Sequence, residues 1–374
     1  MNDKNFIHTK IEKSLRKMIG KNFLSCYELR RIKVLSSMVS SILFSGRTEL
    51  QQMALANPEN KQHSSKVRQY KRLTMNEHVD LETYFFPYII PLLKCLSASG
   101  ELVFSIDGSV VGRGCMCLMF SVIYKGKAIP VVWDVYKRKK GHLPEKEHCA
   151  LLKKLKELVP DGCRVVITGD GEFDGCHRQA DILEAKWDYV LRTGKGRQIT
   201  EACGDQFKAG SICLNEEETL FFESIGFTKK ELEANLFIWQ GKGHNAPLIL
   251  VTNLDFDAEI KRFYKKRFKI EPFFRDLKSQ GFHINRSGLQ DAKRLKRLLI
   301  AACIAYIFCV MASTKAYKTK FYNKFSRTDS EVLSLFQLGR RFILFLVDSR
   351  QWRAFSIQRD LTPELSFSYN PVPF

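Results

Sequence analysis

Apolar and polar residues follow different periods in different parts of the chain. Up to about residue 90, apolar residues recur every three or four positions, as in LSSMVSSIL at 35–43, and a polar stretch at 57–65 interrupts them. This spacing predicts short helices joined by a loop. From residue 101, the runs ELVFSID, CMCLMFSVIY and AIPVVWDVY are apolar and rich in β-formers, with glycine-containing turns between them. They predict three successive antiparallel strands.

The pattern then alternates between helix and strand. Leucines at helical spacing predict a helix over 145–158, and CRVVITGD predicts a strand. A helix over 178–185 and a strand at WDYVLRT follow. Three strands, helix, strand, helix and strand is the order of an α/β, ribonuclease H-like domain, although other α/β folds share this periodicity.

Two later segments depart from this alternation. Residues 195–254 carry short apolar runs separated by Gly and Asn, which predict a β-rich insertion. A helix rich in Lys, Arg and Phe is predicted over 257–279, with helical patterns after it. The most apolar run, LLIAACIAYIFCVMA at 298–312, has fifteen residues, whereas a membrane span needs about 20. We therefore expect a buried core helix and no membrane partner.

Composition excludes several classes of protein. With 374 residues and 45% hydrophobic residues, the chain can bury the cores of two or three domains, so it is neither disordered, nor collagen, nor a small disulfide scaffold. The eleven cysteines are odd in number, lack zinc-ligand spacing and lie partly in apolar runs (Cys115, Cys117, Cys303, Cys309), which predicts reduced, buried thiols. Without a recognisable secretory signal, we expect a cytoplasmic location.

The charge indicates the class of partner. The formal net charge is +20, so we expect a polyanion, either nucleic acid or an anionic membrane surface. Residues 1–75 hold fifteen Lys or Arg against five Asp or Glu, which is half of the surplus. A solvated helical face is one explanation. The concentration of charge favours the other, a helical DNA-binding domain.

Two aspartates follow predicted strands. Asp107 ends FSID and Asp170 ends VVITGD, and each precedes a glycine. Either one alone is an ordinary turn residue. Together, at the ends of strands in one sheet of a basic protein, they predict a metal position.

A third carboxylate lies in the segment FYKKRFKIEPFFRDLK at 263–278. On one continuous helix, one face would carry Tyr264, Arg267, Glu271, Arg275 and Lys278. Pro272 lacks a backbone donor and is expected to kink the helix directly after Glu271. An ion-paired surface helix is the alternative, but such helices usually balance their charges and this one is basic.

These motifs resemble those of the insertion-sequence-four family of DDE transposases. The spacing of Tyr264, Arg267, Glu271 and Lys278 matches the Tyr-Arg-Glu-Lys signature of that family, and SIDGS and TGDGEFD resemble its two aspartate motifs. The resemblance covers about residues 100–312. It implies that the catalytic and metal-binding triad is Asp107, Asp170 and Glu271.

The resemblance also implies DNA contacts and a reaction. Tyr264, Arg267 and Lys278 would contact phosphates of the transposon end, Arg192 would contact DNA, and Trp239 would stack on a flipped base unless it is a buried core residue. Arg275, on the same helix face, is a further candidate.

The chemistry expected of such a site is metal-dependent. Oxygen-only ligands favour two Mg²⁺ ions, with Mn²⁺ as a substitute. The implied activity is cut-and-paste transposition through a hairpin, performed by a homodimer on inverted-repeat ends and target DNA in a bacterial nucleoid. The alternatives are a ribonuclease H-like nuclease without strand transfer and a non-catalytic DNA-binding regulator of transposition.

The predicted domain organisation follows from these assignments. We expect a helical DNA-binding domain over 1–95 and a ribonuclease H-like catalytic domain over 96–312, with its β-rich insertion at about 195–254. A C-terminal helical region over 313–374 would serve dimerisation or DNA contact.

Overall fold

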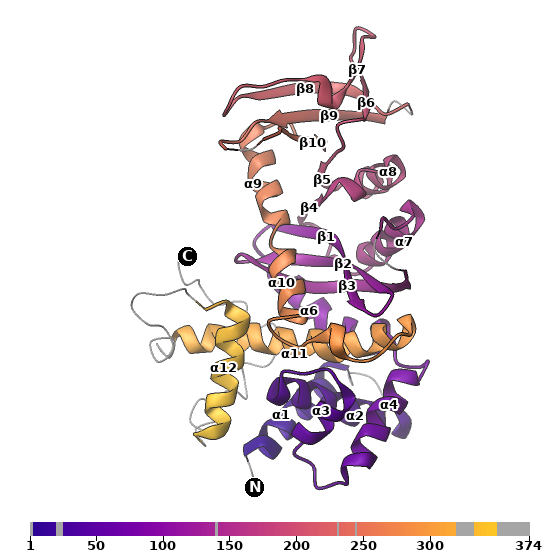
Figure 1. Cartoon of the computed structure of the whole chain (residues 1–374). Helices are drawn as coiled ribbons and strands as arrows, with labels where there is room; N and C mark the ends of the chain where they lie inside the picture. Colours follow the sequence, from indigo (N-terminus) through magenta and orange to yellow (C-terminus); the bar gives the residue numbers. More distant parts are fainter. Residues whose placement is uncertain are drawn as a thin grey trace.

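The computed structural model describes residues 3–19, 25–138, 141–229, 232–243, 245–318 and 333–349. The protein is a mixed α/β structure in which a large sheet stands on a layer of helices (Figure 1). Helices from the N-terminal part of the chain form that layer. Helix α11 lies between it and the sheet, and strands β8 and β9 lie at the far end.

Six helices precede the sheet in the described part of the chain. They are α1 (Asp3–Ile19), α2 (Cys26–Ser45), α3 (Leu50–Ala56), α4 (His63–Met75), α5 (Leu81–Tyr84) and α6 (Phe86–Ser97). Helix α2 begins at a capping box, in which the Ser25 side chain accepts from the N–H of Glu28 and the Glu28 carboxylate accepts from the N–H of Ser25. The helical character expected of this region is confirmed.

Ten described strands form one mixed sheet in the order β3-β2-β1-β4-β5-β10-β9-β8-β6-β7. The first three are β1 (Glu101–Gly112), β2 (Cys115–Tyr124) and β3 (Lys127–Lys137), and they pair antiparallel as predicted. Next come helix α7 (Glu145–Lys156), strand β4 (Arg164–Gly169), helix α8 (Cys176–Glu184) and strand β5 (Asp188–Arg192). Strand β4 pairs parallel to both β1 and β5.

The β-rich segment extends this same sheet. It comprises β6 (Gln198–Thr200), β7 (Gln206–Lys208), β8 (Thr219–Phe227), β9 (Leu232–Trp239) and β10 (Leu248–Thr252). Strand β10 returns to pair antiparallel with β5, so the added strands continue the central sheet. The predicted β character is confirmed, and the continuity of the sheet is a feature that the sequence does not reveal.

The two faces of the sheet carry different helices. Helices α7 and α8 cover one face, while α9 (Asp257–Arg267) and α10 (Ile270–Leu277) run along the other (Figure 1). Under α9, the strands contribute a separate apolar cluster that includes Val103, Val166 and Val190. Because side chains alternate along a strand, every second residue of β1, β4 and β5 points to this face.

The basic helix expected over 257–279 is two helices. Helix α9 ends at Arg267 and α10 begins at Ile270, so the break precedes Glu271 and does not follow it. The reason is Pro272, whose ring would clash with the carbonyl of Phe268, four residues earlier, in a continuous helix. At the break the hydrogen bond spans three residues instead of four: the N–H of Glu271 donates to the Phe268 carbonyl at 3.3 Å.

Helix α11 (Ala292–Lys318) links the helical layer to the sheet. Its Arg297 donates to the carbonyls of Thr74 and Val79, at and just beyond the end of α4. On the sheet side, its Lys296 carbonyl accepts from the Trp133 indole of β3, at 3.3 Å. Two consecutive residues of α11, Lys296 and Arg297, therefore contact strand β3 and the end of α4 respectively.

The apolar run of α11 is buried. Ala292–Ala316 is long and apolar enough to cross a membrane, yet 89% of its most apolar window lies inside the protein, as expected of a core helix. Cys115, Cys117, Cys303 and Cys309 are buried free thiols, as predicted, whereas Cys26, Cys203 and Cys213 are exposed.

One further helix follows in the described part of the chain, α12 (Leu335–Asp348), which packs on α11. Of the C-terminal region 313–374, residues 319–332 and 350–374 lie outside the described residues.

Candidate active site

The register of the sheet brings the two aspartates together. Ile106 of β1 is the parallel partner of Gly169, the last residue of β4, so Asp107 and Asp170 are the next positions on two neighbouring strands. Asp107 does not end its strand as expected, because β1 continues to Gly112 through its pairing with β2. The shorter strand β4 ends at Gly169, so beyond this point β1 has no partner among the described residues on the β4 side, next to Asp107.

Strand alternation places both carboxylates on the face covered by α9 and α10. Val103 points to that face, and Ser105, two residues on, donates from its hydroxyl to the Arg267 carbonyl of α9 at 3.1 Å. Asp107 is the next residue on the same side. On β4, Val166 has the same orientation, and Asp170 follows it by four positions.

Arg267 joins the second aspartate to the glutamate. Its guanidinium donates to an Asp170 oxygen and to a Glu271 oxygen, both at 2.9 Å. The Arg267 side chain is only 7% exposed, whereas the side chains of Asp170 and Glu271 are 37% and 53% exposed. The side chain expected to contact DNA phosphates is, in this structure, an internal bridge between two of the three acids. Its contact with DNA stays a prediction.

The pKa of Asp107 is raised in this arrangement. This pKa rises from 3.8 to about 6, mainly by burial and to a smaller extent by Asp170 and Glu271, while Arg267 and the N–H of Gly108 act in the opposite direction. Three carboxylates therefore influence one another, with the Arg267 guanidinium between two of them and the Arg192 guanidinium 3.6 Å from Asp170. A set of ligands made of oxygen alone suits a hard divalent cation in chemical type.

The geometry adds a condition to that fit. Within the described ranges, no three His, Cys, Asp or Glu side chains are grouped closely enough to hold a metal ion. The Arg267 bridge lies between two of the three acids. Side chains of the triad must therefore rearrange before all three could share an ion, and the Arg267 bridge has to open.

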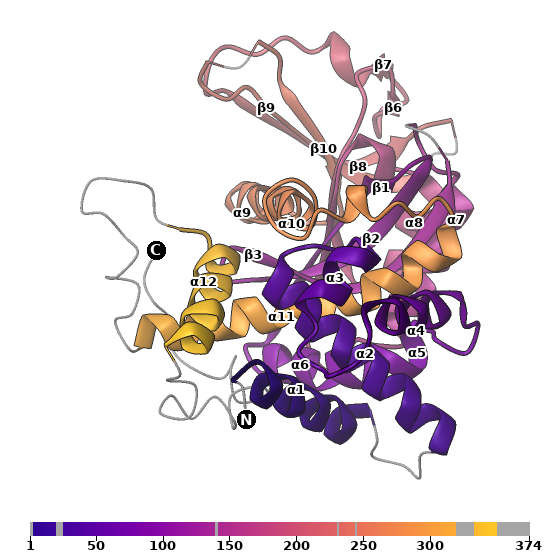
Figure 2. The same ribbon diagram turned by 60° about the horizontal axis from the view of Figure 1, so that its bottom comes forward.

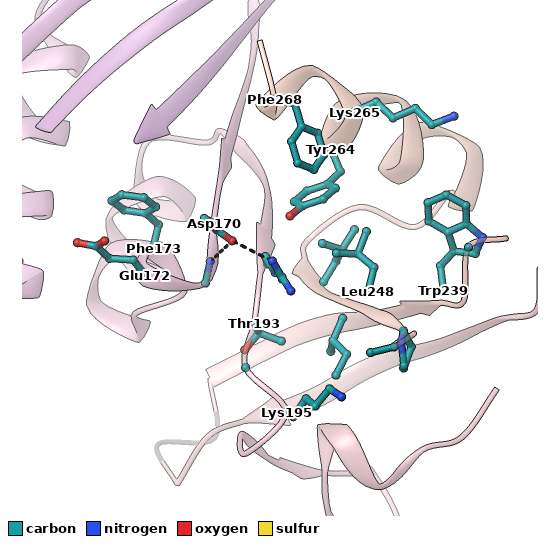
Figure 3. A pocket seen from close by; sticks show the side chains of 18 of the residues that line it. Asp170, Glu172, Phe173, Thr193, Lys195, Trp239, Leu248, Tyr264, Lys265 and Phe268 are labelled. Atoms are coloured by element: carbon teal, nitrogen blue, oxygen red, sulfur yellow. Dashed lines mark hydrogen bonds and ion pairs between the residues drawn. The ribbon is translucent and has the colours of Figure 1, made fainter. Parts of the chain in front are cut away.

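A cavity of about 770 Å³ adjoins Asp170 and is lined by residues from strands β1, β5, β9 and β10, from helix α9 and from the turn after β4 (Figure 3). Tyr264 and Phe268 come from α9 and its end, Trp239 from the end of β9, and Leu248 from β10. Trp239 is only partly buried and has the Lys261 ammonium 5.6 Å from its ring; it lines the cavity and also packs against the apolar cluster under α9. Burial raises the pKa of Tyr264 to about 12, which keeps the phenol protonated at neutral pH.

Arg192 ends β5 at the mouth of this cavity. Its guanidinium lies 3.6 Å from an Asp170 oxygen, and its side chain is 53% exposed. Half of this cation thus remains open to solvent beside the second aspartate.

A smaller cavity of about 320 Å³ also borders Asp107. It is lined by Asp107, Ser109, Glu271, Phe274, Arg275, Lys278 and Ser279. The Lys278 ammonium donates to the Ser109 hydroxyl at 2.6 Å, and burial lowers its pKa while Asp107 raises it. Of the predicted residues, Tyr264, Arg192 and Trp239 border the first cavity, Arg275 and Lys278 border the second, and Asp107 borders both.

A buried polar chain behind Asp170 was not predicted. The Nη1 of Arg178, a fully buried residue, lies 3.1 Å from Nδ1 of His148, whose other ring nitrogen is 3.6 Å from the Glu172 carboxylate. Glu172 also accepts from the N–H of Leu143 at 2.8 Å. The TGDGEFD motif contains Glu172, but nothing in the sequence links it to His148 and Arg178, which come from α7 and α8.

Comparison with known proteins gives three results. Residues 144–308 match the family model described as the transposase DDE domain, a range that includes Asp170 and Glu271 and begins after Asp107. No curated protein matches the chain. Among solved structures, the chain is similar to the piggyBac transposase in a cryo-EM structure of its synaptic complex with hairpin DNA, at 12% identity and a TM-score of 0.45, over 99% of this chain and 84% of that one. A segment of 165 residues that contains two of the three clustered acids thus matches the transposase DDE domain.

Proposed function

We propose that this chain is a DNA transposase that binds the ends of an insertion sequence and catalyses DNA cleavage and strand transfer. The observation that carries the proposal is the position of Asp107, Asp170 and Glu271 on one face of the sheet, the last two within the segment that matches the transposase DDE domain. Strands β1 to β5 with α7 and α8 would form the ribonuclease H-like catalytic domain within 96–312. The helices of 1–95 would bind DNA.

Asp107, Asp170 and Glu271 would hold divalent metal, two Mg²⁺ ions or Mn²⁺ in their place. When bound, such ions supply activation of a water or a 3′-hydroxyl and stabilisation of the leaving oxygen. The protein groups have separate tasks. The sheet fixes the two aspartates, and Arg267, released from its bridge, becomes available to a DNA phosphate.

The cavities offer the DNA two kinds of contact. Lys278 and Arg275 on one side, and Arg192 on the other, present cations to the backbone next to the acids. Trp239 and Phe268 offer aromatic surface in the larger cavity, where an unstacked base would gain about 1–3 kcal/mol. This supports a mechanism in which the freed 3′-hydroxyl attacks the opposite strand to form a hairpin. Two copies on paired ends would complete the reaction.

The test is cleavage of a duplex that carries the inverted repeats flanking the coding sequence, with Mg²⁺ present. Asp107→Asn, Asp170→Asn and Glu271→Gln are each expected to abolish strand breaks and leave binding intact. Asp276→Asn is the matched control, because Asp276 is a buried carboxyl on α10 outside the cluster. Normal cleavage by Glu271→Gln would refute the assignment.

The two alternatives are separated by the same reaction. Cleavage without joining to a target plasmid would identify a nuclease. Binding without any cleavage by the wild-type protein would identify a regulator.

A further inference from the structure

Helix α4 has two faces of different character. Its inner face is tied to the helical layer, since the Tyr70 hydroxyl meets the hydroxyls of Ser37 and Ser41 on α2 at 3.0 and 2.9 Å. The Lys66 ammonium, 8% exposed, donates to the Asn57 carbonyl at 2.9 Å and so closes the loop before the helix. These contacts fix how α4 is rotated about its axis.

The opposite face is open to solvent and basic. Apart from His63 at its first position, its exposed residues fall within an arc of roughly 120° at about 100° per residue. They are Ser64, Ser65, Arg68, Lys71, Arg72 and Met75. Helix α4 contains no acidic residue. We call this set the α4 face.

In the described part of the chain, the cations of the α4 face take part in no ion pair. Some Arg and Lys residues elsewhere in the protein do pair with carboxylates, for example Arg164 with Glu259 and Arg262 with Glu101. Among the residues that the structure describes, none of the ion pairs contains Arg68, Lys71 or Arg72. Three unpaired cations on one side of one helix produce a local positive field that is complementary to a polyanion.

The neighbouring helix supplies the second half of a DNA-reading unit. Helix α3 precedes α4 by a six-residue connection, 57–62, and the two helices pack together against α2. His63, the first residue of α4, has a ring nitrogen 3.2 Å from the Gln51 carbonyl of α3, which fixes their angle. The exposed side chains of α3 include Gln51 and Gln52, which are suited to base edges or phosphates.

We propose that α4 is the recognition helix of this protein and that its α4 face enters the major groove of double-stranded DNA, with α3 beside the backbone. The inference rests on the proposed function and specifies which element binds the transposon end. A helix of thirteen residues fits the groove, which admits one α-helix, and Arg68, Lys71 and Arg72 reach phosphates or base edges from it. At the margin of the helical layer, α4 lies on the opposite side from α12 (Figure 1), and Figure 2 shows it beside α2 and α5.

The test uses the full-length protein and a fluorescently labelled 30-base-pair duplex of mixed sequence. The variant is Arg68→Ala/Arg72→Ala. The control is Lys94→Ala/Lys153→Ala, which removes two exposed cations from α6 and α7. If each arginine neutralises one phosphate, the slope of log affinity against log salt falls by about 1.8, and affinity at 0.1 M salt falls roughly 60-fold. The control is expected to change neither quantity as much.

A second measurement uses the wild-type protein alone. Bound duplex should protect Lys71 from acylation by an activated ester, while Lys153 stays reactive. An unchanged salt slope in the arginine variant, or equal effects in both variants, would overturn the inference, as would acylation of Lys71 in the complex. Cleavage that still depends on Asp107 would then leave the proposed function intact, whereas a wild-type protein that fails to bind any duplex would refute both.

Discussion

Asp107→Asn is expected to stabilise the folded protein at neutral and alkaline pH. Burial raises the pKa of Asp107 to about 6 from its usual 3.8, so the folded state holds this proton more tightly than the unfolded state does. The stabilising contribution of the protonated carboxyl is fully present below about pH 4 and is lost as the pH rises through 6. Asparagine keeps the shape, and can still accept from the N–H of Gly108, without the charge.

The magnitude follows from the same shift. Two pKa units correspond to about 3 kcal/mol at pH 8, and this gain falls to roughly half at pH 5. The assay is urea unfolding of wild-type and variant protein in EDTA across this pH range. Asp276→Asn is the control, because burial also raises the pKa of Asp276 to about 6 and Asp276 lies outside the acid cluster. Both variants should gain stability at pH 8, and only Asp107→Asn should lose cleavage.

The outcome can contradict the reasoning in two ways. A variant Asp107→Asn that is less stable than wild type at pH 8 would mean that the carboxylate stabilises the fold. An equal gain at pH 5 and pH 8 would mean that the effect comes from packing and not from ionisation.

Three other predictions concern the same site. Arg267→Met should lower the free energy of unfolding by roughly 1–2 kcal/mol in urea, since it leaves Asp170 and Glu271 without their bridge; the partial exposure of both acids keeps the figure modest. Mg²⁺ at ten times its dissociation constant should stabilise wild type by about 1.4 kcal/mol in the same assay, and Asp107→Asn by less. Trp239→Ala should preserve the first nick and slow hairpin formation roughly 10- to 100-fold in a gel time course, as the loss of one stacking contact implies; unchanged hairpin kinetics would remove Trp239 from the site.

Local patterns predict most of the fold. The three antiparallel strands, the helix at 145–158 and the β-rich segment all follow from apolar periodicity, which is a property of short stretches of chain. The position of Asp107 within its strand does not, because β1 continues to Gly112 through its pairing with β2. The opening of the sheet beside Asp107 depends on where β4 ends relative to β1, and that register joins residues about sixty positions apart. The sequence predicts that Asp107 and Asp170 lie in one sheet, but it does not predict the parallel β1–β4 register that makes them neighbours.

The helix break illustrates a second limit of sequence patterns. The sequence marks Pro272 as a disruption, but the break falls earlier, because in a continuous helix its ring would clash with the carbonyl of Phe268, four residues before it. The role of Arg267 could not be predicted for a related reason. Its spacing to Glu271 is visible in the sequence, whereas its bond to Asp170 crosses from α9 to the end of β4.

The position of α11 has a consequence for where the DNA would be cut. Consecutive residues of this helix contact the end of α4 and strand β3, so the proposed recognition helix and the sheet that carries the two aspartates are held in a fixed relative position. A DNA duplex bound by α4 would therefore have to present its scissile phosphate at one distance along the duplex and at one rotation about its axis. One extra base pair between the sequence bound by α4 and the cleavage point turns the scissile phosphate by roughly 35° about the helix axis, away from the acids. We expect such an insertion to stop cleavage instead of moving the cut by one nucleotide.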